Sequence, residues 1–144
     1  MKIVYRRAEF DDMDQLFPLA ESLATSFQLN RTDFSSVFLE LLKDPNADIL
    51  LAEIDSKLIG YVLAFHHATF YANGEVTWVE EVFVSAEYRG DGVGKRLMDK
   101  VEELSLKRGS KLVALATRRA HQFYSAIGYE ESATYYKKTL VDEK

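Results

Sequence analysis

The spacing of apolar positions changes along the chain, and each spacing predicts a different element. Residues 2–7 alternate between apolar and polar positions and predict a strand. From Asp11, apolar residues recur at helical intervals as far as Phe27, with acidic residues at the start of the stripe. Pro18 interrupts this stripe, so we expect a kink there or a later start to the helix.

Four further elements follow. A second helical stripe spans residues 34–42 and ends at Asp44-Pro45-Asn46. Residues 49–54 and 58–66 flank a polar turn and predict a hairpin. Residues 75–84 form another β-rich run after an Asn-Gly turn. This part of the chain therefore predicts a helix followed by three strands.

The last third of the chain alternates helical and β patterns. Residues 92–108 have helical spacing and are followed by a glycine stop. Residues 112–116 form a short apolar run that predicts a strand buried on both faces. Residues 120–127 predict a short helix, and residues 134–140 predict a closing strand.

This order of elements predicts a mixed α/β fold, with strand–helix–strand crossovers in the second half. We see no repeat or linker and expect one domain over residues 1–144. The chain has no cysteine, which excludes a disulfide framework and a cysteine nucleophile. The longest nearly apolar stretch, residues 58–65, is much shorter than the roughly 20 residues of a membrane helix, and the N-terminus lacks a signal-peptide pattern. We therefore expect a cytoplasmic protein with no membrane partner.

Charge is distributed unevenly along the sequence. Residues 1–88 carry 15 acidic and 6 basic side chains, whereas residues 89–119 carry 9 basic and 4 acidic ones. A short basic segment in an acidic chain predicts a site for a small anionic ligand, with a helix that has a solvated basic face as the alternative. Nucleic-acid-binding domains are usually basic as a whole, so we expect no nucleic-acid partner.

The segment Arg89-Gly90-Asp91-Gly92-Val93-Gly94 lies between a predicted strand and a predicted helix. Glycines at such a position let backbone N–H groups approach a ligand, and the helix start adds partial positive charge. Together with the neighbouring cations Lys95 and Arg96, the segment predicts a phosphate-binding loop. It fits neither common nucleotide motif, because a Walker loop needs Gly at position 89 and Ser or Thr at 96, and a dinucleotide fingerprint needs Gly at 95 or 97.

Two motifs in the second half of the chain resemble a known family. Arg89-x-x-Gly92-x-Gly94, preceded by Glu80-Glu81-Val82-Phe83-Val84, is similar to the acyl-CoA pyrophosphate loop of the GNAT superfamily of N-acetyltransferases. Ala120-x-x-Phe123-Tyr124-x-x-x-Gly128-Tyr129 resembles the C-terminal motif of that superfamily. The resemblance implies a GNAT-like fold, with a mostly antiparallel sheet that splays between its fourth and fifth strands and about four helices.

The resemblance also implies acetyl-CoA as co-substrate, in a V-shaped opening between residues 75–84 and 112–116. Main-chain groups of the strand before the loop would hold the pantetheine arm, at Val82, Phe83 and Val84. Arg89 and the backbone N–H groups of the loop would hold the pyrophosphate, at Gly90, Asp91, Gly92, Val93, Gly94 and Lys95. Arg118 or Arg119 would reach the phosphates or remain solvated. Many members have Asn where this chain has Thr117, which puts one polar contact to the co-substrate in doubt.

Acetyl transfer to an amine needs a base, because a primary amine with a pKa near about 10 is mostly protonated at neutral pH. Glu80 and Glu81 are the candidates, and strand alternation places them on opposite faces. The position of Glu80 resembles the general base of polyamine-type members, acting through water, so Glu80 is preferred and Glu81 is the reserve. The alternative is that both are ordinary surface residues at a strand end.

The C-terminal motif assigns Tyr124 the role of the acid that protonates the departing CoA thiolate. The alternative is a core tyrosine whose hydroxyl bonds to the backbone. A main-chain N–H of Val82 or Phe83 would meet the developing oxyanion if the strand bulges there. His66, His67 and His121 lack metal-ligand spacing, so we expect no metal.

The favoured function is acetyl transfer from acetyl-CoA to a primary amine of a small cationic molecule or peptide, because the first 88 residues are acidic. The alternative is an acyl-CoA-binding regulatory module without turnover, which would need neither Glu80 nor Tyr124. In proteins of this kind, the loop between the first two helices shapes the acceptor site. The acceptor and the presence of a homodimer are left open.

Overall fold

The computed structural model describes residues 2–141. Strands and helices follow the chain in this order: β1 (Val4–Arg7), α1 (Met13–Leu23), α2 (Arg31–Lys43), β2 (Ala47–Ile54), β3 (Lys57–Thr69), β4 (Gly74–Val84), α3 (Val93–Arg108), β5 (Val113–Leu115) and α4 (His121–Ala126). Short 3₁₀ turns precede α1 and α3. Within the described residues, no helix is long and apolar enough to cross a membrane.

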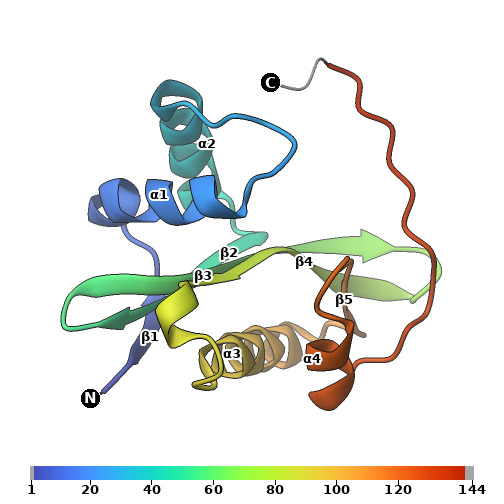
Figure 1. Ribbon diagram of the computed structural model, residues 1–144. Coiled ribbons are helices and arrows are strands. Elements are labelled where there is room, and N and C mark those ends of the chain that lie inside the picture. Colours follow the sequence, from blue (N-terminus) through green and yellow to red (C-terminus); the bar gives the residue numbers. More distant parts are fainter. Residues whose placement is uncertain (1, 142–144) are drawn as a thin grey trace.

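One five-stranded sheet, in the order β1-β2-β3-β4-β5, runs through the fold. The first four strands pair antiparallel, and β5 pairs parallel with β4. Helices α1 and α2 cover one face of the sheet, and α3 and α4 lie on the other (Figure 1). This architecture confirms the expected fold class, a mixed and mostly antiparallel sheet with four α-helices.

Each face of the sheet has its own hydrophobic cluster. Beneath α1 and α2, the buried residues include Leu16, Phe38 and Leu51. On the α3 face they include Leu97 and Met98, which pack on alternate residues of β2, β3 and β4. The helical stripes predicted from the sequence are the faces buried in these two clusters.

A β-bulge in β4 sets the faces of its last residues. Leu63 of β3 pairs with Glu81, but the next residue, Ala64, pairs with Val79, so Glu80 is the extra residue. Because of this insertion, the alternation of side chains reverses at Glu80. In a regular strand, residues three positions apart face opposite sides, but here Val79 and Val82 both pack on the α3 face.

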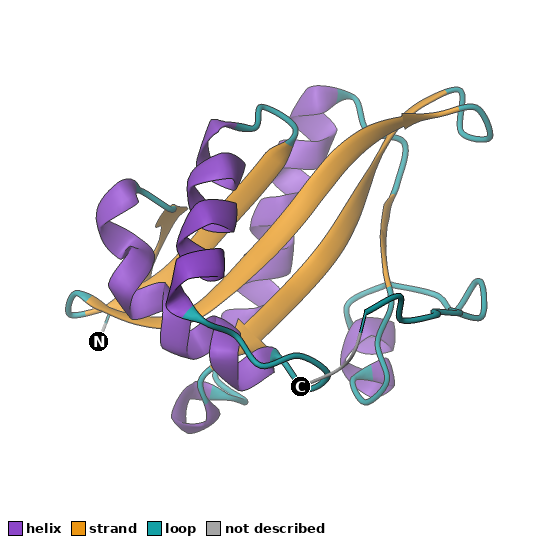
Figure 2. Ribbon diagram, turned by 90° about the horizontal axis from the view of Figure 1, so that it is seen from above, coloured by secondary structure: helices purple, strands orange, loops and turns teal. Residues whose placement is uncertain are grey.

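The sheet opens at the same place. Strand β5 pairs with β4 only at Thr77, Trp78 and Val79, so the pairing stops immediately before Glu80. Beyond this point β4 continues to Val84, and within residues 2–141 the one strand that pairs with it there is β3. The two strands diverge in the view from above (Figure 2). This geometry matches the V-shaped opening that the family resemblance implies between residues 75–84 and 112–116.

Three local expectations are wrong. Residues 134–140 form no strand, because the segment runs exposed and away from the sheet. The run 112–116 is not buried on both faces, since Leu112 is 40% exposed and the residues of β5 are only half-buried. Helix α1 ends at Leu23 rather than Phe27, which lies in the loop and is 47% exposed. Each prediction extended a local pattern that lacks a packing partner in the tertiary structure.

A buried polar network joins the sheet to α3 at the end of the sheet away from the glycine loop. His66 Nε2 lies 2.6 Å from an Asp48 carboxylate oxygen, and His66 Nδ1 lies 2.9 Å from the Thr77 hydroxyl. The Thr77 hydroxyl also contacts that of Ser105 at 2.8 Å, and Arg7 pairs with Asp48. Every polar group of this cluster is hydrogen-bonded, so it can be buried without a large penalty.

Candidate active site

The glycine loop has the geometry of an anion site. Gly90 has φ +88° and Gly92 has φ +83°, which are left-handed conformations that favour glycine. Gly92 is the N-cap of α3, and Arg96 N–H donates the first helical bond to its carbonyl at 3.0 Å. Within the described chain, the amides of Val93, Gly94 and Lys95 donate no hydrogen bond. Three amides at a helix start are therefore free to meet a phosphate.

The cations around the loop are already oriented by other groups. Arg89 Nε donates to the Val84 carbonyl at 2.9 Å, and its guanidinium stacks over the Phe83 ring. Lys95 forms an exposed pair with Asp99, and Arg96 lies near the same carboxylate and over Tyr5. The exposed pairs are weak and leave these side chains able to turn toward a ligand. Arg89 mainly fixes the end of β4 against the loop.

Helix α4 packs directly against the start of α3. A Cβ added at Gly94 would lie 3.3 Å from the Phe123 ring, so this glycine allows the close approach of the two elements. The Thr117 hydroxyl accepts a 3.1 Å hydrogen bond from Ala120 N–H and thereby caps the turn into α4. Arg118 and Arg119 are exposed beside it.

Tyr124 lies in the aromatic cluster of α4. Its ring packs edge-on against Phe123 and Tyr129, with centroid distances of 4.9 and 5.9 Å. Burial raises the pKa of Tyr124 above its ordinary value, so the phenol stays protonated at neutral pH. Among the hydrogen bonds of residues 2–141, none uses its hydroxyl. A protonated phenol without a partner is able to donate to a ligand.

The sheet face opposite α3 contains a mainly apolar cavity of about 380 Å³ between α1, α2, their connecting loop and β4. Phe27 and Leu29 line it from the loop, and Phe34 and Val37 line it from α2. Its carboxylates are Asp33 and Glu81, and no Lys or Arg is among its lining residues. The cavity therefore combines an apolar wall with negative charge.

Glu81, and not Glu80, faces this cavity. Glu81 lies on the cavity wall and accepts a 2.7 Å hydrogen bond from the hydroxyl of Tyr61. Burial raises the pKa of Glu81; the hydrogen bond from Tyr61 partly opposes that rise, and the charge of Glu80 adds to it. Glu80 is exposed at the bulge. A partly buried carboxylate with a raised pKa is a better general base near neutral pH than an exposed one.

The structure brings the other sequence-predicted site residues to the same region. Val82, Phe83 and Val84 lie on the part of β4 that β5 has left, next to the glycine loop. The bulge falls at Glu80 rather than at Val82 or Phe83. Sequence reasoning did not identify Tyr61 as a site residue. The signal that could have found it is that Tyr61 lies in β3, the strand that pairs with the strand carrying Glu80 and Glu81.

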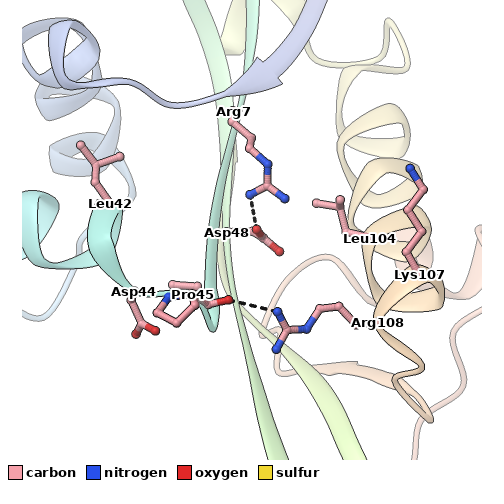
Figure 3. Close-up of a pocket in the computed structure, with 9 residues that line it drawn as sticks. Arg7, Leu42, Asp44, Pro45, Asp48, Leu104, Lys107 and Arg108 are labelled. Carbon is pink, nitrogen blue, oxygen red and sulfur yellow. Dashed lines mark hydrogen bonds and ion pairs between the residues drawn. The ribbon is translucent and has the colours of Figure 1, made fainter.

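A second cavity, of about 290 Å³, lies at the other end of the sheet, between the ends of α2 and α3 (Figure 3). Its arginines already have partners. Arg7 pairs with Asp48, and Arg108 donates to the Pro45 carbonyl at 3.0 Å and forms a pair with Glu75. These contacts join β1 to β2 and the end of α3 to β4, and they account for the two arginines without a ligand.

Comparison with known proteins places the geometry in a family. A model of the Acetyltransferase (GNAT) family matches residues 11–129. The chain is 30% identical to the aminoalkylphosphonate N-acetyltransferase of Salmonella typhimurium, over 94% of this chain and 90% of that protein. It is 25% identical to the thialysine N-epsilon-acetyltransferase of Bos taurus, over 91% of this chain and 76% of that protein.

A solved structure shows the same fold. Glucosamine-6-phosphate N-acetyltransferase from Arabidopsis thaliana superposes with a TM-score of 0.87 at 20% identity, covering 98% of this chain and all of that one. The family match includes the glycine loop, the splayed strands and Tyr124. The chain therefore belongs to the GNAT family of acetyltransferases and is an acyltransferase.

Proposed function

We propose that this protein transfers the acetyl group of acetyl-CoA to a primary amine held in the cavity beneath α1 and α2. The observation that carries the proposal is the position of Glu81. This residue lies on β4, the strand that borders the V-shaped opening, and it lines a cavity whose wall is mainly apolar but contains two carboxylates. The cavity and the glycine loop lie on opposite faces of the sheet, so the opening would connect the two substrates.

The chain's own groups fit acetyl-CoA. The free amides of Val93, Gly94 and Lys95 suit a pyrophosphate, and the side of β4 that β5 has left, from residue 80 to 83, suits the amide groups of a pantetheine arm. The left-handed Gly90 and Gly92 have no heavy atom within 4 Å of an added Cβ, which leaves room for a ligand against the backbone. When bound, acetyl-CoA supplies the activated acetyl group.

We assign the proton transfers to two side chains. Glu81 takes the proton of the attacking amine, directly or through water, and Tyr61 holds its carboxylate in place. Tyr124 donates its phenolic proton to the departing thiolate. Glu80 lies at the bulge and contributes negative charge near the base. Because the bulge lies at Glu80 and Glu81 lines the cavity, we propose Glu81 as the base in place of Glu80, which the sequence favoured.

The cavity lining suggests the class of acceptor. Asp33 and Glu81 favour a cationic amine, whereas the aromatic and aliphatic lining favours an alkyl or aryl body. The named relatives act on thialysine and on aminoalkylphosphonates. Because no Lys or Arg of the described residues lines this cavity, we propose an amine without a phosphonate or phosphate group.

A panel of acceptors scored by release of free CoA tests the proposal. The panel contains thialysine, lysine, alkyl and aryl monoamines, polyamines, an aminoalkylphosphonate and glucosamine 6-phosphate. We expect turnover with amines that lack an anionic phosphorus group. Turnover with the phosphonate or the sugar phosphate alone would refute the assigned specificity. Binding of acetyl-CoA without CoA release from any amine would favour a regulatory module.

A further inference from the structure

The helix that carries Tyr124 has little of its own to hold it in place. Helix α4 has six residues, and none of them is buried. A helix of this length is not stable by itself, so its position depends on what it packs against. One such contact is that of Phe123 with Gly94, in the first turn of α3. The position of Tyr124 therefore depends on how α4 is attached to α3.

The turn after α4 brings Tyr129 back onto Tyr124. Gly128 has φ +100°, a left-handed conformation that favours glycine. Gly128 N–H donates to the Ser125 carbonyl at 3.2 Å, and Tyr129 N–H donates to the Tyr124 carbonyl at 2.9 Å. These two bonds form a Schellman motif, in which the residue after the glycine contacts the helix residue that accepts its N–H. The rings of Tyr124 and Tyr129 accordingly meet edge-on, with their centroids 5.9 Å apart.

Tyr129 is in turn fixed to α3 by a polar contact. Its hydroxyl donates a 2.7 Å hydrogen bond to Glu102, in the middle of α3. Burial raises the pKa of Tyr129, and the hydrogen bond to Glu102 adds to the rise, so the phenol stays protonated at neutral pH. A hydrogen bond to an ionised carboxylate is stronger than one between neutral groups. The contact is therefore suited to holding the Tyr129 ring in one place.

The hydroxyls of the two neighbouring tyrosines are used differently. The proton of Tyr129 is directed at Glu102, whereas in the described part of the chain no hydrogen bond uses the hydroxyl of Tyr124. Glu102 thus engages one phenol, and the other remains available to a ligand.

We propose that Glu102 and Tyr129 are positioning residues for Tyr124, an inference that rests on the proposed role of Tyr124 as the acid. The carboxylate of Glu102 holds the ring of Tyr129, and this ring supports one side of the Tyr124 ring and so fixes the direction of its hydroxyl. Proton transfer needs hydrogen-bond distance, so a small displacement of the donor removes much of its effect. Because α3 begins at the glycine loop, the same helix presents the amides for the pyrophosphate and orients the acid.

Kinetics of Tyr129→Phe test the proposal, because this variant keeps the ring and loses the bond to Glu102. We expect kcat for CoA release to fall about tenfold, with the Kd for acetyl-CoA unchanged in calorimetry. The acidic limb of the pH profile, which we assign to Glu81, should not move.

The Tyr124→Phe background shows whether Tyr129 acts through Tyr124. There, Tyr129→Phe should cause no further loss of kcat, because the donor that it positions is already absent. An equal loss in both backgrounds would overturn the proposal, since general damage to the fold would act in both. Full turnover in Tyr124→Phe alone would refute the acid and its positioning residues together, while leaving acetyl transfer itself intact.

Substitutions of Glu102 provide the second measurement. Glu102→Ala should lower kcat as much as Tyr129→Phe does, and the double variant should be no slower than either, because both changes remove the same hydrogen bond. Glu102→Gln keeps an oxygen that accepts from Tyr129 and should retain most of the activity.

Glu103→Ala is the matched control for Glu102→Ala. Glu103 is the next residue of α3 and forms an exposed pair with Lys100 at 3.8 Å, so its loss removes the same charge without touching Tyr129. We expect kcat close to that of the natural protein. Additive losses in the double variant, or a loss in Glu102→Gln or Glu103→Ala as large as in Glu102→Ala, would contradict the proposal.

Discussion

The hydroxyl of Tyr61 donates a 2.7 Å hydrogen bond to Glu81 across the pair of strands β3 and β4. Tyr61 is only 3% exposed, and burial together with the charge of Glu81 raises the pKa of its phenol. The contact exists because the bulge at Glu80 turns Glu81 to the face on which Tyr61 lies.

Replacing Tyr61 by Phe removes the hydrogen bond that favours the ionised form of Glu81. The pKa of Glu81 is then expected to rise further, because burial and the charge of Glu80 are no longer opposed by this hydrogen bond. The acidic limb of the pH profile of kcat/KM should move to higher pH by the same amount. Tyr129→Phe is the matched control, because it removes a 2.7 Å hydrogen bond to Glu102 on α3. Equal shifts in both variants would show that Tyr61 does not act through Glu81.

Replacing Glu81 by Gln should lower kcat/KM by about 100-fold, because the amine loses its base. Glu80→Gln is the control, and its effect should be under about tenfold. Equilibrium binding of acetyl-CoA should be unchanged in both variants. A greater loss in Glu80→Gln would return the role of base to Glu80.

Although Glu81→Gln should lower activity, it should not lower the stability of the fold. The folded-state pKa of Glu81 is raised, so its ionised form disfavours folding, and this penalty grows as the pH rises through the folded-state pKa. Near pH 8, Glu81→Gln should therefore have a Tm equal to or above that of the natural protein. A clear fall in Tm would indicate that the carboxylate is structural.

Replacing Tyr124 by Phe should lower kcat by about 100-fold and leave the Kd for acetyl-CoA nearly unchanged, because only proton donation is lost. Steady-state kinetics and calorimetry measure the two quantities. Tyr71→Phe, on an exposed tyrosine in the β3–β4 turn, is the control. Unchanged turnover in Tyr124→Phe would leave Tyr124 with a packing role.

Gly92 and Gly109 provide a matched pair at the two ends of α3. Both are left-handed, with φ of +83° and +81°, and neither has a heavy atom within 4 Å of an added Cβ. Each Gly→Ala variant should lose about 1 kcal/mol of folding free energy through backbone strain. Only Gly92→Ala should also weaken binding of acetyl-CoA, measured by calorimetry. Equal affinities in the two variants would contradict the placement of the pyrophosphate.

His66→Ala should destabilise the fold by about 3 kcal/mol at pH 7, because buried Asp48 loses one of its partners. Burial alone would raise the pKa of Asp48, but hydrogen bonds from His66 and Arg7 outweigh it and hold the pKa below its ordinary value. A lowered pKa adds stability above about pH 4, which is lost as the pH falls through the folded-state value. Urea unfolding should therefore show a smaller effect of the substitution near pH 3. Lys57→Ala, at an exposed ion pair, should cost under about 1 kcal/mol at either pH.

The local pattern of the sequence determined most elements and predicted where the co-substrate binds. Helical spacing predicted α2 and α3, and alternation predicted the strands of the β2–β3 hairpin. The glycines of residues 90–94 predicted a phosphate loop, because left-handed turns and helix starts depend on a few neighbouring residues. The sequence also limited the base to two adjacent glutamates.

Only the tertiary structure decided which glutamate faces the cavity beneath α1 and α2, and where β4 continues without β5 beside it. The bulge at Glu80 arises from hydrogen-bond register with β3, and β3 begins 23 positions earlier in the chain than Glu80. A one-residue insertion reverses every following side chain, and no local pattern records it. Residues 134–140 fail as a strand of this fold for the related reason that a strand exists only where another backbone accepts its hydrogen bonds.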